Sequence, residues 1–278
     1  MDWVLIAKAL ILGIVEGVTE FLPVSSTGHL ILAGALLGFD NEAAKAFHVV
    51  IQFGAILAVC WEYRRRIGAV VAGLPTDMEA RRFTLNVVIA TIPAIALGIF
   101  VESQIKRVLF APLPVALALV VGGLIILWVQ ARERMRGDTP PRIGSIEQLR
   151  PLDALKVGVA QCCALIPGVS RSGSTIIGAM MVGVERRVAT EFSFFLAIPI
   201  IVGASCYEIV KYGHSALAGA ADVLAVGIVA AFVSAFACVR WLLRFVATHD
   251  FTVFAWYRIG FGLLVLVIGY TYELPWVS

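Results

Sequence analysis

The sequence predicts an all-α polytopic membrane protein built as an inverted repeat, in which each half is a re-entrant helix-loop-helix hairpin plus three transmembrane helices. Composition, an internal repeat and the spacing of apolar stretches predict this fold. Of the 278 residues, 60% are hydrophobic and only 15% are charged, which leaves too little polar surface for a soluble globule. The chain is therefore expected to form a single integral membrane domain.

The internal repeat relates residues 9–60 to a segment about 145 positions later, without a gap. The motif PVSSTGH at 23–29 is answered by PGVSRSGS at 167–174. The matched pairs are Gly13 with Gly158, Val24 with Val169, Ser25 with Ser170, Gly28 with Gly173, Gly38 with Gly183 and Phe47 with Phe192. The predicted organisation is repeat one over about 1–131, a cytoplasmic linker over about 132–152, and repeat two over about 153–278.

Six apolar stretches are long enough to cross a membrane, which needs about 20 residues. They are 43–61, 83–101, 108–131, 188–210, 218–240 and 252–272, three in each half. Segments 3–38 and 153–184 instead contain a longer apolar helix, a break rich in Pro, Ser and Gly, and a shorter apolar piece. As a helix, residues 29–38 reach only about 15 Å, half the roughly 30 Å hydrocarbon layer. Both segments are therefore expected to be re-entrant hairpins that line a polar site.

The distribution of positive charge orients the chain. Three spans per half is an odd number, so the second half begins on the opposite face and the repeats are inverted. One side receives Arg64, Arg65, Arg66, Arg81, Arg82, Arg132, Arg134, Arg136, Arg142, Arg150, Lys156, Arg186, Arg187, Arg240 and Arg244, and the other receives Lys8, Lys45, Lys106, Arg107 and Lys211. The positive-inside rule makes the first side cytoplasmic and places both termini outside. The two hairpins then enter from opposite faces, and their loops meet.

Several classes of function are excluded by composition. The five cysteines lie in apolar segments without metal-ligand spacing, so they are expected to pack as small hydrophobic residues. The net charge is only +3, and no basic run carries the interleaved aromatic residues that would suggest nucleic acid. The first segment also lacks a signal-peptide cleavage pattern, because Glu16 and Glu20 interrupt its apolar run.

The first hairpin carries two acidic residues, Glu16 and Glu20, which are four apart and share one face of a helix. An isolated carboxylate at membrane depth is costly, so the pair is expected to share a proton, bind a divalent cation or face a cationic partner. The alternative is that both carboxylates lie in the outer headgroup region and are solvated.

The break in the first hairpin supplies hydroxyl groups next to a helix start. Pro23 is expected to end the first helix, after which Ser25, Ser26 and Thr27 precede the next one. A helix start presents unpaired N–H groups and a partial positive charge, which suit an anion. His29 adds a base, an acid or a phosphate contact, or it packs as a hydrogen-bonded histidine between helices.

The second hairpin places a cation at the equivalent break, where Arg171 lies among Ser170, Ser172, Ser174 and Thr175. A guanidinium can hold two oxygens of a phosphate at once, so this group is expected to bind an anion. The alternative is a structural ion pair between Arg171 and a glutamate of the first hairpin. In the repeat, Gln161 takes the place of Glu16 and Leu165 takes that of Glu20, so the acidic chemistry belongs to the first half.

The remaining polar residues in or near the spans are weaker candidates and are expected to be structural. They are His48, Gln52, Glu191, Glu208, Asp222 and Arg258. Helix-end placement explains most of the acidic ones. Arg258 is expected to extend towards the cytoplasmic interface.

Two long motifs carry a resemblance to a known family. GIVEGVTEFLPVSSTGHL at 13–30 and PGVSRSGST at 167–175 resemble the two signature motifs of undecaprenyl-diphosphatases, also called bacitracin resistance proteins. The resemblance covers essentially the whole chain. It implies a bacterial inner-membrane enzyme that hydrolyses undecaprenyl diphosphate to the monophosphate and phosphate, and so recycles the lipid carrier for peptidoglycan. It also implies interdigitated inverted repeats, a divalent cation such as Mg²⁺ or Ca²⁺, and a site open to the periplasm.

The resemblance also assigns roles to residues. It makes Glu16 and Glu20 the acidic pair, Ser26 and His29 catalytic candidates, and Ser170, Arg171 and Thr175 the diphosphate-binding group. Ser25, Thr27 and Ser172 are expected to join that group, and the acidic pair is the candidate metal site. The expected partners are a polyprenyl diphosphate, membrane lipids, and bacitracin, which competes by sequestering the substrate. The sequence leaves open whether a second copy joins in a homodimer.

Two chemical routes and two other functions are left open by the sequence. Either Ser26 attacks the phosphate, with His29 taking its proton, or water attacks directly. The same midplane site would serve a secondary transporter or lipid flippase, because inverted repeats with broken helices are also a transporter architecture. An intramembrane serine protease is the third reading, which Arg171 and the paired carboxylates disfavour because they suit phosphate better than a peptide.

Overall fold

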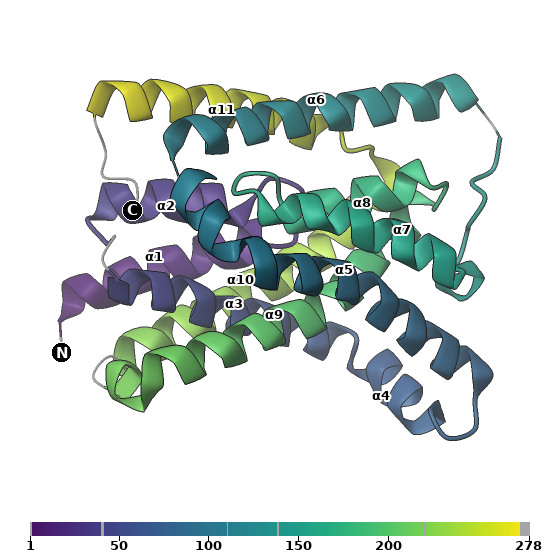
Figure 1. The fold of residues 1–278 in the computed structure, drawn as a ribbon, viewed down its shortest axis with the longest axis horizontal. Coiled ribbons are helices and arrows are strands. Elements are labelled where there is room, and N and C mark those ends of the chain that lie inside the picture. Colours follow the sequence, from purple (N-terminus) through teal and green to yellow (C-terminus); the bar gives the residue numbers. More distant parts are fainter. Residues whose placement is uncertain (1, 40–41, 110, 138, 219–220, 273–278) are drawn as a thin grey trace.

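The computed structural model describes residues 2–39, 42–109, 111–137, 139–218 and 221–272. Within these ranges, the side chains of residues 42–45, 102–108, 112, 208–218 and 270–272 are not described, so the expectations for Lys45, Lys106, Arg107, Lys211 and Glu208 lie outside the described residues. Nearly all of the described chain is helical (Figure 1).

The first half contains α1 (Trp3–Thr19), α2 (Ser26–Leu37), α3 (Glu42–Glu62), α4 (Arg64–Gly73), α5 (Met78–Leu109) and α6 (Pro112–Arg136). A connection with the short 3₁₀ helix η1 (Ile146–Gln148) leads to the second half. That half contains α7 (Pro151–Gln161), the 3₁₀ turn η2 (Cys162–Leu165), α8 (Arg171–Met181), α9 (Arg186–Ala218), α10 (Ala221–Thr248) and α11 (Thr252–Tyr272).

The expected membrane spans are confirmed. Five helical segments are long and apolar enough to cross a membrane: Met78–Val101, Leu113–Arg136, Arg186–Tyr207, Ala221–Thr248 and Thr252–Gly269. A sixth span is provided if α3 and α4 count as one, although they are bent by 74° at Tyr63. The chain is thus a polytopic all-α membrane protein.

Two boundaries differ from the sequence expectation. The first expected span ends at 61, whereas Arg64–Gly73 forms the separate helix α4 with no buried residue. Its three leading arginines favour water or headgroups, so it bends away from α3 instead of extending it. The sequence also predicts a linker over 132–152, but α6 continues to Arg136 and α7 already begins at Pro151. Proline at the first helical position suits that start, because its missing N–H would be unpaired anyway.

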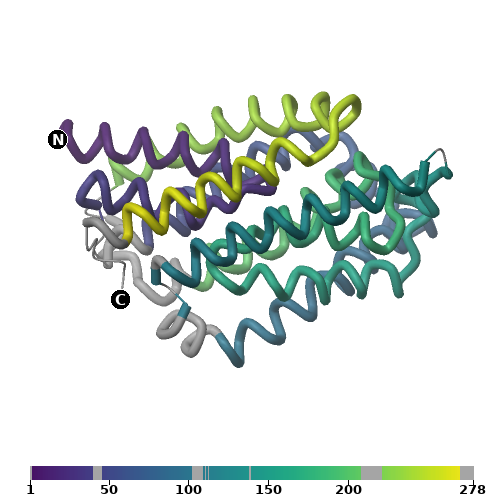
Figure 2. Tube along the Cα trace, turned by 90° about the horizontal axis from the view of Figure 1, so that it is seen from above, coloured from purple at the N-terminus to yellow at the C-terminus, as the bar shows by residue number. Residues whose placement is uncertain are grey.

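Both predicted hairpins are present. The first is α1 followed by a break and α2, and the second is α7 with η2, a break and α8. Figure 1 shows α1 and α2 in one half of the molecule and α7 and α8 in the other, so the hairpins enter from opposite ends. The beginning of α1 and the end of α11 lie at one end, whereas α4 and the connection around η1 lie at the other (Figures 1 and 2).

Each hairpin packs against a helix of the other half. Helix α1 lies along α10, and its repeat equivalent α7 lies along α5; α3 also packs on α9, and α6 on α11. Small residues permit the two close crossings. A Cβ atom at Gly13 would meet the carbonyl of Gly227, and one at Gly158 would meet the carbonyl of Ala90. These helix exchanges match the interdigitated halves that the resemblance implies.

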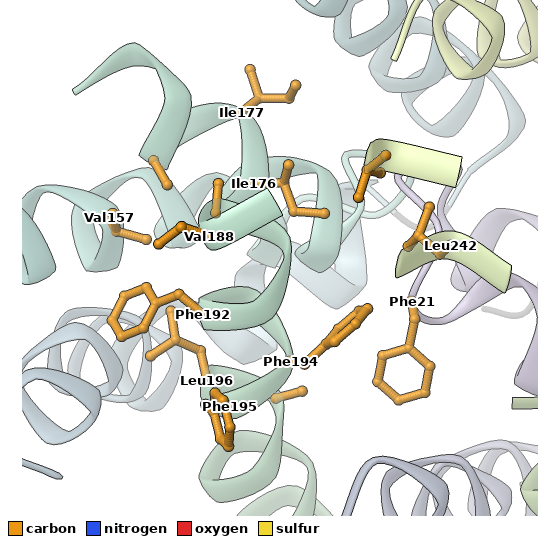
Figure 3. Close-up of a cluster of buried hydrophobic side chains, with 14 of the residues drawn as sticks. Phe21, Val157, Ile176, Ile177, Val188, Phe192, Phe194, Phe195, Leu196 and Leu242 are labelled. Atoms are coloured by element: carbon orange, nitrogen blue, oxygen red, sulfur yellow. The ribbon is translucent and has the colours of Figure 1, made fainter. Parts of the chain in front are cut away.

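A cluster of buried hydrophobic side chains joins the break of the first hairpin to helices α8 and α9 (Figure 3). Phe21, in the break of the first hairpin, packs edge to face on Phe194 of α9 with the ring centroids 5.6 Å apart. Phe192 and Phe195 of the same helix join this cluster, as does Ile176 of α8. The break of the first hairpin is thus embedded in protein, which is the condition for irregular backbone at membrane depth.

Enlarging Gly13 is expected to separate α1 from α10. In Gly13→Val the added side chain would collide with the backbone of Gly227, and overpacking of this kind costs about 1–3 kcal/mol. The midpoint of thermal unfolding in detergent should fall. The control is Gly203→Val in α9, because nothing lies within 4 Å of a Cβ at Gly203. Equal midpoints for the two variants would contradict the close crossing.

Candidate functional site

The first hairpin breaks at a serine in an unusual backbone conformation. Ser25 caps the N-terminus of α2 with φ at 73°, and its hydroxyl oxygen accepts the N–H of Gly28. A non-glycine residue in such a region costs on the order of 1–3 kcal/mol, so neighbouring contacts must hold it. Helix α2 therefore starts abruptly at Ser26, directly after this cap.

The second hairpin repeats this conformation. Ser170 caps α8 with φ at 75°, and its hydroxyl oxygen accepts the N–H of Gly173 at 3.0 Å. These two serines are the only non-glycine residues with positive φ in the described chain. The sequence repeat is therefore reproduced at the level of backbone angles, and the N-termini of α2 and α8 are the two halves of one site.

One buried arginine connects the two breaks. The guanidinium of Arg258 donates to the carbonyl oxygens of Pro23 in the first break and of Gly168 and Val169 in the second, at 2.9–3.2 Å. It also donates to Ala118 and Leu119 of α6, and its exposed fraction is 1%. The expectation that Arg258 extends to the cytoplasmic interface is therefore wrong, because five backbone carbonyls offer it better partners inside the protein.

Three side chains that the sequence singled out come together between the hairpins. The Ser26 hydroxyl donates to Glu20 Oε2 at 2.5 Å, and Arg171 Nε lies 3.3 Å from Glu20 Oε1. Arg171 Nη1 donates to the carbonyl of Ser193, while Nη2 has no hydrogen-bond partner. The expected alternative of an ion pair between Arg171 and a glutamate is thus present, and one nitrogen of the guanidinium is still free to bind an anion.

Glu16 lies beside this group with its exposed fraction at 0%, so the alternative of solvation in the headgroup region is wrong for it. Both of its carboxylate oxygens are buried without a hydrogen-bond partner, and Glu20 and Arg171 are the charged groups that act on it. Such orphaned oxygens fit a shared proton or a divalent cation. Among the described residues, no group of three or more His, Cys, Asp or Glu side chains could hold a metal, so protein carboxylates alone would leave most of a cation's coordination open.

A pocket of about 180 Å³ lies between the two breaks. Its polar lining comes from Glu20, Ser25, Ser26, Thr27, Gln52, Gln161, Ser170 and Arg171, and its apolar lining includes Leu165, Ile166, Ile200 and Ile201. Hydroxyl groups, one carboxylate and one guanidinium thus face a space bounded by both helix N-termini. This arrangement suits a small anion with several oxygens.

His29 is not the hydrogen-bond partner of Ser26 in this structure. Its Nδ1 lies 2.7 Å from the carbonyl oxygen of Ser25, and its Nε2 lies 2.7 Å from the Tyr257 hydroxyl. Because a carbonyl only accepts, Nδ1 carries the proton and a neutral ring accepts at Nε2 from Tyr257. The ring also stacks on Phe261 with the centroids 4.0 Å apart. His29 thus faces α11, and Glu20 takes the place beside the Ser26 hydroxyl.

Ser172 and Thr175 are fully buried, and their hydroxyls have protein partners. Ser172 donates to the carbonyl of Leu22 at 2.7 Å, which ties the second hairpin to the first. The Thr175 hydroxyl bonds the Ser193 hydroxyl at 2.6 Å and lies near the carbonyl of Arg171. In the described part of the chain neither residue lines the pocket, so their contacts support Arg171 and the break.

Comparisons with known proteins add an independent observation. The family model for the bacitracin resistance protein BacA matches residues 9–264. Undecaprenyl-diphosphatase 1 of Burkholderia cenocepacia (strain HI2424) is 70% identical over 276 residues, which cover 99% of this chain and 100% of that protein. Undecaprenyl-diphosphatase 1 of Paraburkholderia xenovorans (strain LB400) is 68% identical over 278 residues, with both chains covered completely. The chain belongs to the BacA family.

Four residues of this BacA-family site were missed by sequence reasoning: Gln52, Ser193, Tyr257 and Arg258. Gln52 and Arg258 were noted only as structural. An ionisable residue at membrane depth is a functional candidate by default, and that rule would have singled out Arg258. Ser193 and Tyr257 carry no such signal, since a serine or tyrosine within an apolar helix is common.

The Thr175 hydroxyl is expected to contribute to stability. Thr175→Val keeps the shape but leaves the Ser193 hydroxyl without this partner in a buried position, which costs about 1–3 kcal/mol. Thermal unfolding in detergent should show a lower midpoint for Thr175→Val, and Thr175→Ser should stay near wild type. A valine variant as stable as wild type would contradict the hydrogen bond.

Proposed function

We propose that this protein hydrolyses undecaprenyl diphosphate to undecaprenyl phosphate and phosphate, as the names of its relatives indicate for them. The observation that supports the proposal is the convergence of Ser26, Glu20 and Arg171 on one pocket between two helix N-termini. A nucleophile, a base and an anion clamp are the groups that phosphoanhydride hydrolysis needs.

The diphosphate would bind between the hairpins. The free Nη2 of Arg171 would take a phosphate oxygen, and the N-termini of α2 and α8 would supply amide donors and partial positive charge. The hydroxyls of Ser25, Thr27 and Ser170 line the same pocket and would orient the phosphate, whereas Ser172 and Thr175 would hold Arg171 and the break in place. The prenyl chain would remain among the lipid-facing helices.

The geometry favours Glu20 as the base for Ser26. In the covalent route the Ser26 oxygen attacks the terminal phosphorus and its proton passes to Glu20, while the bond from phosphorus to the bridging oxygen breaks. Undecaprenyl phosphate leaves with that electron pair. Water then attacks the phosphoserine, and the Ser26 oxygen leaves and regains a proton. In the direct route Glu20 orients a water for attack, and Ser26 only positions it.

Glu16 and Glu20 would hold the divalent cation, Mg²⁺ or Ca²⁺. The orphaned oxygens of Glu16 fit such a group because hard cations prefer carboxylate oxygens. When bound, the cation would neutralise charge that develops on the leaving oxygen. His29 would stabilise the break through its Nδ1 bond to the Ser25 carbonyl and through the bond that its Nε2 accepts from the Tyr257 hydroxyl.

The membrane setting supports a role in carrier recycling for peptidoglycan synthesis. The protein would lie in the inner membrane with both termini and the mouth of the site on the periplasmic face. The arginines of α4 and of the connection around η1 lie at the opposite end of the molecule from the start of α1, which fits the positive-inside rule. Bacitracin would act by sequestering the diphosphate substrate, and the protein would work as a homodimer.

Phosphate release by the purified protein tests the proposal. With a C15 or C55 prenyl diphosphate in detergent, wild type should release phosphate, and a chelator should suppress the release. Arg171→Lys should lower kcat/KM by about 10²-fold or more, because a single ammonium cannot bond Glu20, the Ser193 carbonyl and a phosphate oxygen in the fixed planar geometry of a guanidinium. A folded wild-type protein that binds the lipid but releases no phosphate would favour the flippase alternative, which vesicle-based lipid transport would then measure.

The two routes of hydrolysis differ in what Ser26 does. Ser26→Ala should lose at least about 10²-fold in kcat if the serine forms a covalent intermediate. Brief incubation of wild type with a substrate carrying ³²P at the terminal phosphate, followed by acid quenching, should label Ser26. The control is Ser174→Ala, whose hydroxyl is buried without a partner and outside the pocket. Near-normal turnover of Ser26→Ala would exclude the covalent route.

A further inference from the structure

We propose that Arg258 is a positioning residue of the catalytic site, which holds Ser26 of one repeat against Arg171 of the other by binding both hairpin breaks at once. This inference rests on the proposed function, because its readout is the hydrolysis. Arg258 lies outside both repeated motifs, yet its guanidinium binds the breaks of both halves. A single residue therefore serves both breaks.

The carbonyls that Arg258 binds are related by the internal repeat. Pro23 and Gly168 occupy equivalent positions, each two residues before the serine that caps the following helix. Arg258 Nη1 donates to the Pro23 carbonyl at 3.2 Å, and Nη2 donates to the Gly168 carbonyl at 3.0 Å. The two ends of one guanidinium thus bind matching atoms of the two halves, so the distance between the breaks is set by one planar group.

The carbonyls that Arg258 binds lie only a few residues along the chain from Ser26 and Arg171. Ser26 and Arg171 are the first residues of α2 and α8, and each follows a strained serine cap. Fixing the carbonyls of Pro23 and Val169 fixes the direction from which each cap enters its helix. Arg258 itself is absent from the pocket lining in the described chain, so it acts through the backbone and is not a catalytic residue.

The remaining donors of Arg258 tie the breaks to a long helix. Its Nε and Nη2 donate to the carbonyls of Leu119 and Ala118, which belong to α6. Together with the bonds to the breaks, these bonds use the five N–H donors of the guanidinium, which the single nitrogen of a lysine cannot replace. Helix α6 has room for the guanidinium only because residue 122 is glycine: a Cβ at Gly122 would collide with Nη2 of Arg258.

The charge of Arg258 also suits an anion site. Its hydrogen-bond partners in the described chain are neutral carbonyls, and it takes part in no ion pair there. Its positive charge is therefore not cancelled by a carboxylate. It lies next to two helix N-termini whose partial charges have the same sign, and it adds to the field that attracts a diphosphate.

The test compares two independent changes to this contact, with phosphate release per folded molecule as the readout. Arg258→Lys keeps the charge but loses most of the bonds, and Gly122→Ala keeps Arg258 but displaces its guanidinium. Displacing reacting groups by about 1 Å can cost about 10²-fold, so both variants should lower kcat by ten- to a hundredfold, with a smaller change in KM. Gly260→Ala in α11 is the matched control, because nothing lies within 4 Å of its Cβ.

Chemical rescue separates positioning from general stability. In Arg258→Ala, added ethylguanidinium should restore part of kcat, and ethylammonium at the same concentration should not. If Arg258→Lys and Gly122→Ala are both folded and keep kcat within threefold of wild type, the inference is overturned. If Arg258→Lys does not fold, Gly122→Ala decides alone. Absence of phosphate release from wild type would instead refute the proposed function itself.

Discussion

The rest of the structure depends on the hydrogen bonds of one buried guanidinium, that of Arg258. Two re-entrant hairpins enter the molecule from opposite ends and must stop at the same depth, where their backbones have no regular partners. Arg258 supplies five hydrogen bonds at this point, to both breaks and to α6. Since unpaired carbonyls at membrane depth are costly, this side chain makes the junction of the two halves possible.

A second constraint is that neither half forms a working site alone. The first repeat supplies the carboxylates and Ser26, whereas the second supplies Arg171 and has Gln161 and Leu165 where the acids would be. Glu20 bonds both Ser26 and Arg171, so one carboxylate connects the Ser26 hydroxyl of one repeat with the cation of the other. The two repeats thus share a helix N-terminus at the break but carry different side chains beside it.

Helix packing holds the two halves of the site in fixed positions relative to each other. Helix α1 lies on α10 and α7 on α5, so each hairpin is supported by the half to which it does not belong. Phe21 on Phe194 and Ser172 on the Leu22 carbonyl add contacts at the breaks themselves. Strained caps such as Ser25 and Ser170 persist only where surrounding contacts outweigh their cost, and these exchanges provide such contacts.

The sequence by itself determined the spans, both hairpins and the motif residues Glu20, Ser26 and Arg171, because hydropathy, the ungapped repeat and the break residues are local patterns. Only the tertiary structure decided which side chains form hydrogen bonds with one another. In the folded chain Ser26 donates to Glu20, His29 contacts Tyr257, and Arg258 is buried between the hairpins. These partners are 6, 228 and up to 235 residues apart, and the three-dimensional packing of helices, which no local pattern encodes, brings the distant ones together.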